Sequence, residues 1–254
     1  MNEGTKKYSD LLVDICHRLY AKGFVTATDG NVSVRLENGN ILTTRTSVNK
    51  GMVTSDDFVE VDPSGKPVIP HRQPSTEIGM HLFIYSKRPD VNAVVHAHPT
   101  YATGFATARQ ALNACLFPEV IVGLGSIPLA EYATPSTEEV ANSLAPFVGN
   151  ADAILLANHG VVTYGKDLYD AYFKMEKVEH AAHITFVARM LDGEKVLSVG
   201  EVEKLRAISM KAYGKDFSVK PACESGPQQS ESSPSPSSDD DLRELVRQMI
   251  RPKS

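Results

Sequence analysis

The stretch that decides the fold runs from Val94 to Pro99 and consists of Val-Val-His-Ala-His-Pro. It closes a short apolar run of the kind that forms a buried β-strand. Side chains alternate across a strand, so His96 and His98 are expected to point to the same face. Neutral imidazole is the commonest protein ligand for a divalent transition metal. The pattern predicts a metal site, and the alternative is a strand end with two solvated or hydrogen-bonded histidines.

Two more candidate ligands stand at the ends of other predicted elements. Glu77 follows Ser75 and Thr76, whose hydroxyls are typical caps of a helix N-terminus, so its alternative role is an acid in the first helical turn. His159 lies in the polar turn Asn-His-Gly between two apolar runs that predict strands, and packing explains this turn poorly. Three histidines and one carboxylate would surround a metal ion and leave an exchangeable position for substrate. His81 shares the predicted helix face of Glu77 and is a candidate to orient its carboxylate.

Three loops carry the side chains that commonly bind phosphate. Two of them are turns rich in small polar residues, over residues 28–34 and 44–51, and the third is the predicted helix start at Ser75 and Thr76. Hydroxyls, amides and free backbone N–H groups of this kind surround phosphate groups, although Gly-Asn is also ordinary turn chemistry. The sequence has no Walker loop and no Gly-x-Gly-x-x-Gly, so a nucleotide cofactor is not expected.

Four motifs, taken in their order and spacing, resemble the class II aldolase/adducin family, and most closely its fuculose-phosphate aldolase branch. They are Gly30-Asn31-Val32-Ser33, Pro74-Ser75-Thr76-Glu77, His96-x-His98 and Asn158-His159-Gly160. The resemblance covers about residues 8–217. It implies a homotetramer with an α/β fold, a three-layer α/β/α sandwich whose central sheet is mostly antiparallel. It also implies zinc-dependent cleavage or rearrangement of phosphorylated ketoses.

The resemblance further implies roles for individual residues. Zinc would be held by His96, His98 and His159, with Glu77 as a displaceable fourth ligand that becomes the acid/base. The positions that match the family's phosphate-binding residues are Asn31, Thr46, Ser47, Ser75 and Thr76. Tyr213 matches a C-terminal tyrosine that reaches the active site of a neighbouring subunit.

One position departs from the family pattern. Where the aldolase has a second catalytic tyrosine, this chain has Phe117. Either Glu119 delivers the proton to the aldehyde oxygen instead, or the substrate preference differs.

The reaction that the resemblance implies is the cleavage of a 6-deoxy-ketose 1-phosphate, such as L-fuculose 1-phosphate, to dihydroxyacetone phosphate and lactaldehyde. Breaking the C3–C4 bond leaves an enediolate, whose charge a zinc ion would stabilise as a Lewis acid. Glu77 would then give C3 its proton. Lys50 is the one lysine beside a predicted site loop, so a covalent Schiff-base mechanism is not expected.

Other members of the family remain alternatives. A sugar-phosphate 4-epimerase typically carries Asp where Glu77 stands, and a methylthioribulose-phosphate dehydratase uses a differently placed glutamate. The non-enzymatic alternative is an adducin-like head domain that has lost its metal ligands, whereas all four candidate ligands are present here.

Composition predicts a cytoplasmic enzyme with one sizeable domain. The chain has 254 residues, of which 42% are hydrophobic, and a formal net charge of −5, which argues against nucleic acid as a partner. The N-terminus has no signal-peptide pattern, and no apolar run approaches the length of a transmembrane helix, so no membrane partner is expected.

The C-terminal segment has a different composition. We expect a catalytic domain over residues 1–217, a flexible Pro/Ser-rich linker over 218–238 and a short amphipathic helix over 239–254. The apolar stripe of this helix consists of Leu242, Leu245, Val246, Met249 and Ile250. Such a short helix needs a partner. Linker and helix resemble the encapsulation peptides that recruit enzymes into bacterial microcompartments, which implies a shell protein as partner. Folding back onto the enzyme is the alternative, and membrane-surface binding is a weaker one because the stripe lacks aromatic anchors.

Overall fold

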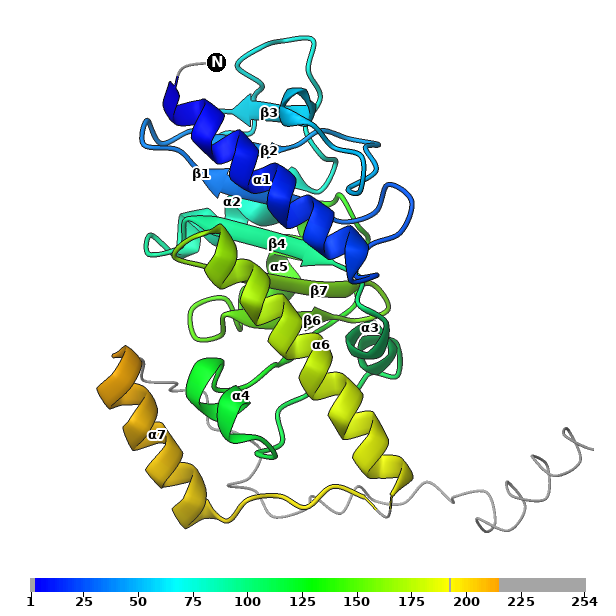
Figure 1. The fold of residues 1–254 in the computed structure, drawn as a ribbon, viewed down its shortest axis with the longest axis vertical. Coiled ribbons are helices and arrows are strands. Elements are labelled where there is room, and N and C mark those ends of the chain that lie inside the picture. Colours follow the sequence, from blue (N-terminus) through cyan, green and yellow to red (C-terminus); the bar gives the residue numbers. More distant parts are fainter. Residues whose placement is uncertain (1–2, 192, 215–254) are drawn as a thin grey trace, which may run out of the picture. The chain divides into compact units, whose positions relative to one another are not determined.

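A seven-stranded sheet forms the centre of the computed structural model, which describes residues 3–191 and 193–214 (Figure 1). The strand order is β3-β2-β1-β4-β7-β6-β5, and every neighbouring pair is antiparallel except β5 and β6. The strands are β1 (Asn31–Arg35), β2 (Ile41–Thr44), β3 (Phe58–Val61), β4 (Ala93–Ala97), β5 (Leu129–Ala130), β6 (Ala153–Leu156) and β7 (Gly160–Gly165). The mostly antiparallel sheet and the predicted α/β fold class are confirmed.

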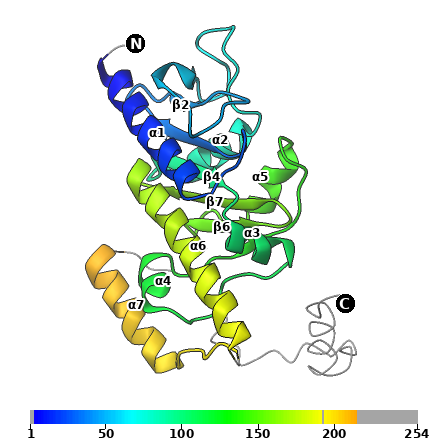
Figure 2. The ribbon, with the colours of Figure 1, turned by 45° about the vertical axis from the view of Figure 1, so that its right-hand side comes forward.

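Helices cover both faces of this sheet (Figures 1 and 2). One layer consists of α1 (Glu3–Ala21), α3 (Thr100–Thr107) and α6 (Leu168–Met190), and the other of α2 (Ile78–Lys87) and α5 (Glu138–Leu144). Two separate hydrophobic clusters, one for each face, fill the space between sheet and helices. The remaining helical elements are the 3-10 turn η1 (Ser55–Asp57), α4 (Pro118–Gly123) and α7 (Val199–Tyr213). The three layers of the predicted sandwich are therefore present.

The central strand β4 shows why its sequence takes this place. All five of its residues are buried. Val95 packs in the cluster of α1 and α6, whereas Val94 packs in the cluster of α2. A strand covered on both faces is apolar on both faces, which explains the continuous run of small and branched residues. His96 has the parity of Val94, so its position in the strand belongs to the α2 face.

The start of α2 differs from the prediction. The helix begins at Ile78, with Glu77 as its N-cap, rather than at Ser75 or Thr76. The Glu77 N–H donates to the Ser75 hydroxyl at 3.3 Å, and the Ser75 N–H donates to the Thr44 carbonyl oxygen at 3.0 Å. The chain stays tied to the end of β2 at this point, which delays the helix. Glu77 is consequently not an acid of the first turn, and its side chain makes no capping hydrogen bond.

The predicted C-terminal segments lie outside the described residues. This applies to the linker 218–238, to the helix 239–254 and to the domain boundary at residue 217. Tyr213 is the last residue of α7, and its side chain is also outside the described part. No helix in the described ranges combines the length and apolar character that a bilayer-spanning helix needs.

One buried carboxylate ties both helical layers to the sheet. Asp152, which is 4% exposed and directly precedes β6, accepts from Arg88 Nη2 at 2.9 Å and lies 3.0 Å from Lys174 Nζ. Arg88 caps the C-terminal end of α2, and Lys174 belongs to α6. Removing one partner of a buried ion pair leaves an uncompensated charge, which is far more costly than losing an exposed pair.

We predict that Asp152→Asn lowers the free energy of unfolding by about 3 kcal/mol, because Arg88 and Lys174 lose the charge that they share. Asp90→Asn is the matched control. Asp90 also pairs with Arg88, but its side chain is 64% exposed, so the loss should stay below about 1 kcal/mol. Urea unfolding at equal protein concentration measures both variants, and equal losses would contradict the prediction.

Candidate active site

The three predicted histidine ligands converge at one end of the sheet. His96 lies in β4, His98 follows the end of that strand, and His159 lies in the turn between β6 and β7. One ring nitrogen from each histidine lies within 4.8 Å of the others. The Nε2 atoms of His96 and His98 are 3.1 Å apart. Residues more than 60 positions apart in the sequence thus form a single cluster.

Glu77 faces this cluster from the start of α2. Its Oε2 atom lies 3.4 Å from His96 Nε2, and its Oε1 atom lies 3.3 Å from His159 Nε2. The carboxylate approaches two of the three histidines, and its side chain is 15% exposed. All four residues that the sequence analysis assigned to a metal are therefore brought together.

The donor set fits a divalent cation. His96 Nδ1 lies 2.9 Å from the Val161 carbonyl oxygen, which can only accept, so Nδ1 carries the proton and Nε2 presents a lone pair. That lone pair faces a carboxylate oxygen of Glu77, which is also an acceptor. Burial and the neighbouring imidazoles hold the pKa of His96 well below its usual range, and burial lowers that of His98. Neutral imidazoles and a carboxylate with converging lone pairs are the ligands that transition metals prefer.

Two residues of the Asn-His-Gly turn suit their positions for different reasons, Asn158 for its backbone conformation and Gly160 for the space that it leaves. Asn158 has a left-handed φ of +55°, which Asn tolerates better than most residues, and its Oδ1 accepts from Arg109 Nε at 2.7 Å. Gly160 lies directly against His98, and a Cβ atom at this position would meet the His98 ring and lie 2.6 Å from the Ala97 carbonyl oxygen. The motif therefore presents His159 from a turn and leaves room for the ring of His98.

A cavity of about 320 Å³ opens beside the cluster. Glu77, His98 and His159 line it. Its wall also contains all five residues that the sequence analysis assigned to the substrate phosphate, namely Asn31, Thr46, Ser47, Ser75 and Thr76. The structure brings metal candidates and phosphate candidates to one cavity, and their individual roles stay predictions.

The cavity wall includes residues that the sequence analysis did not assign to the site. Arg45 and Lys50 add positive charge, and Ser136 arrives from the loop after β5 with a left-handed φ of +65°. Lys50 is 2% exposed, and its Nζ donates to the carbonyl oxygens of Thr28 at 2.7 Å and Val48 at 3.0 Å. Burial lowers the pKa of Lys50. Its place inside the polar turn 44–51 was the available signal, whereas nothing local marks Ser136.

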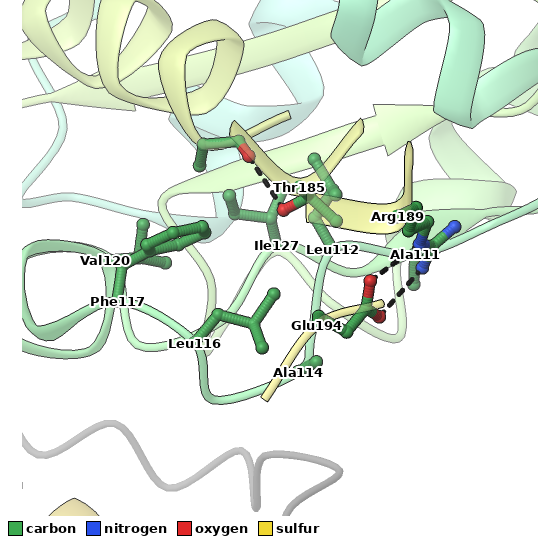
Figure 3. A pocket seen from close by; sticks show the side chains of 11 residues that line it. Ala111, Leu112, Ala114, Leu116, Phe117, Val120, Ile127, Thr185, Arg189 and Glu194 are labelled. Carbon is green, nitrogen blue, oxygen red and sulfur yellow. Dashed lines mark hydrogen bonds and ion pairs between the residues drawn. The ribbon is translucent and has the colours of Figure 1, made fainter. Parts of the chain in front are cut away.

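Phe117 and Glu119 do not line this cavity. Phe117 lies beside Val120 in a mainly apolar pocket on the inner side of α4 (Figure 3). Glu119 lines another hollow, next to Lys166 and Phe173. Within one subunit, therefore, Glu119 does not stand where it could replace a tyrosine hydroxyl at these histidines.

We predict that Gly160→Ala weakens binding of a divalent metal, with Zn²⁺ as the probe, about tenfold or more, because the new methyl group displaces the His98 ring. Gly104→Ala is the control, since a Cβ atom there meets nothing within 4 Å. Competition with a chromogenic chelator measures both affinities. An affinity of Gly160→Ala equal to that of Gly104→Ala would show that His98 does not contribute to the metal site.

Comparisons with known proteins show the family of this chain. Residues 10–186 match the family model described as the Class II Aldolase and Adducin N-terminal domain. An L-fuculose phosphate aldolase from Methanococcus maripaludis is 36% identical over 180 residues, which cover 70% of this chain and 96% of the relative. A 3-oxo-tetronate 4-phosphate decarboxylase from Escherichia coli is 31% identical over 201 residues, covering 76% of this chain and 92% of the relative.

A solved structure of an L-fuculose 1-phosphate aldolase superimposes with a TM-score of 0.74 at 32% identity, covering 83% of this chain and 98% of that one. The family match extends over more than half of the chain and includes Glu77 and the three clustered histidines. The chain belongs to the class II aldolase and adducin family.

Proposed function

We propose that this protein is a zinc-dependent aldolase that cleaves a 6-deoxy-ketose 1-phosphate, such as L-fuculose 1-phosphate, to dihydroxyacetone phosphate and lactaldehyde. The observation that carries the proposal is the single cavity that joins Glu77 and two of the clustered histidines to the predicted phosphate-binding side chains. Relatives named L-fuculose phosphate aldolase support the choice of substrate. Family membership supports the broader assignment to the lyases.

The protein's own groups divide the work between binding and proton transfer. His96, His98, His159 and Glu77 would hold the metal, which supplies a Lewis acid to the substrate's oxygens when it is bound. The hydroxyl-bearing loops at Thr46–Ser47 and Ser75–Thr76 would take the phosphate, with the positive charge of Lys50 and Arg45 in the same wall.

Glu77 is the group that we assign to proton transfer at carbon. Its carboxylate lines the cavity, and its Oε1 atom lies 3.3 Å from His159 Nε2. In aldol cleavage the C3–C4 bond breaks, the electron pair stays on C3, and C3 takes a proton, which Glu77 would deliver. The C4 hydroxyl must lose its proton to another group. Because Phe117 has no hydroxyl, Tyr213 of a neighbouring subunit is the candidate for this second role.

A second candidate is the decarboxylation of a 3-oxo-tetronate 4-phosphate. Two observations favour it, the relatives of that name and the phenylalanine at position 117. In this reaction the C1–C2 bond breaks, C1 leaves as carbon dioxide, and C2 keeps the electron pair and takes a proton. The product is again dihydroxyacetone phosphate. Decarboxylation needs no base for a substrate hydroxyl, so it would not require a tyrosine where Phe117 stands.

We also propose that the protein is a homotetramer, as the family resemblance implies. Exposed apolar side chains on α6 support association, among them Phe173, Phe186 and Met190, which are 53%, 47% and 72% exposed. Delivery to a microcompartment shell through residues 239–254 is proposed on the sequence pattern alone.

We predict release of dihydroxyacetone phosphate and lactaldehyde from L-fuculose 1-phosphate, lost after zinc is removed by a chelator and restored by added zinc. The same protein is assayed in parallel for carbon dioxide release from 3-oxo-tetronate 4-phosphate. Turnover of the acid alone would assign the decarboxylase. Proton NMR of each reaction mixture would also reveal epimerised or dehydrated products, which would overturn the aldolase proposal.

We predict that Glu77→Gln lowers kcat by about 10²-fold or more, because the amide cannot exchange a proton with the substrate carbon. The three histidines should still retain zinc, so metal content, measured by elemental analysis, separates lost chemistry from lost metal. Glu138→Gln, on the neighbouring helix α5, is the control and should keep wild-type kcat. Unchanged turnover in Glu77→Gln would remove Glu77 from the catalytic role.

A further inference from the structure

A row of buried polar side chains leads from the interior of the protein to Glu77. The hydroxyls of Tyr85 and Ser33 are 2.8 Å apart, and Ser33 Oγ lies 2.6 Å from His81 Nδ1. His81 Nε2 lies 2.5 Å from Asn31 Oδ1, and Asn31 Nδ2 donates to Glu77 Oε2 at 2.8 Å. The first four residues are at most 5% exposed, so water does not compete for the three bonds among them.

The row alternates between two elements that the fold holds face to face. Asn31 and Ser33 lie two residues apart on β1 and share one strand face. His81 and Tyr85 lie four residues apart on α2, so they stack on one helix face. The distance spanned by two residues of a strand is close to that spanned by four residues of a helix. This match allows four consecutive hydrogen bonds between the sheet and the helix.

The direction of every bond in the row is fixed from its outer end. An ionised carboxylate only accepts, so the nitrogen of the Asn31 amide faces Glu77 and its oxygen faces His81. The amide oxygen only accepts, so His81 must donate from Nε2.

The same reasoning continues inward. Burial lowers the pKa of His81 to about 3, so the imidazole is neutral and carries one ring proton. With that proton on Nε2, Nδ1 is an acceptor and Ser33 donates to it. The Ser33 oxygen then accepts from the Tyr85 hydroxyl. All four donors point toward Glu77, and one arrangement satisfies every group.

We propose that Tyr85, Ser33 and His81 are positioning residues that lock the Asn31 amide with its nitrogen toward the active site, so that Asn31 presents only hydrogen-bond donors to Glu77 and to the substrate. One amide hydrogen holds Glu77, and the second is free for an oxygen of the substrate, because Asn31 lines the cavity. A flipped amide would place its oxygen against the carboxylate of Glu77. The proposal rests on the proposed function in taking Glu77 as the acid/base.

Neutron diffraction from perdeuterated crystals of the full chain tests the lock without any substrate. We expect a deuteron on His81 Nε2 and none on Nδ1, a Ser33 deuteron directed at His81, and both amide deuterons of Asn31 on the side of Glu77. A deuteron on His81 Nδ1, or an Asn31 oxygen facing Glu77, would overturn the proposal. This result holds whichever substrate the enzyme uses.

Kinetics test whether the lock matters for turnover. Ser33→Ala removes the donor to His81 Nδ1 and leaves this buried acceptor without its partner, and we expect kcat to fall about tenfold with a smaller change in KM. Tyr85→Phe should have a weaker effect, because Ser33 still keeps its own hydrogen on His81. Thr185→Val is the matched control, since Thr185 is 3% exposed and its hydroxyl makes one buried bond to Ala181 outside the site.

Equal kcat values for Ser33→Ala and Thr185→Val would contradict a positioning role, even if both variants are less stable. Folding of each variant is checked by circular dichroism, and Tyr85→Phe, which loses one atom, covers the case in which Ser33→Ala does not fold. Wild-type protein that turns over neither phosphoketose nor oxo acid would contradict the proposed function, whereas the neutron result would still decide the lock.

Discussion

Antiparallel pairing of β4 with β1 and β7 is the constraint on which the site depends. In this register His96 stands opposite Asn31 on one side and opposite Val162 on the other. The first pairing brings the Asn31 amide next to the histidines, and the second places the Val161 carbonyl at His96 Nδ1. A slip of one residue in either pair would turn His96 to the α1 and α6 face and dissolve the site. The metal candidates therefore depend on the whole sheet rather than on a local loop.

The sequence predicts those features of the site that depend on residues close together in the chain. The shared face of His96 and His98 follows from strand alternation, and Asn158 is a residue type common at left-handed turn positions, so both were accessible without the fold. The need for Gly160 was not accessible, because it arises from close packing against His98 and Ala97. The predicted start of α2 was wrong because a hydrogen bond from the Ser75 N–H to the Thr44 carbonyl oxygen overrides the local capping signal. These two residues are far apart in the sequence. Long-range pairing decides such cases, and no window of sequence contains it.

The row of hydrogen-bonded side chains behind Glu77 could be predicted from the sequence only in part, for the same reason. His81 was predicted, from its helix spacing, to be a candidate for orienting the Glu77 carboxylate. In the structure it acts on Asn31, 50 positions away, and Asn31 contacts the carboxylate. The share of Ser33 and Tyr85 in this row follows from the way α2 packs against β1, which hydrophobic periodicity does not specify. Tyr213 poses a different problem, since its expected contact is with another subunit.

Aldol cleavage and decarboxylation make the same demand on this part of the protein. Both reactions leave an electron pair on a carbon next to a ketone, and both end when that carbon is protonated to give dihydroxyacetone phosphate. Glu77, the donors of Asn31 and the loops that we propose to bind phosphate would serve either reaction without change. What separates the two is the group that leaves, an aldehyde whose hydroxyl needs a base or a carboxylate that needs none. The choice between these two reactions should therefore depend on positions such as 117 and 213, while the site around Glu77 stays common to both.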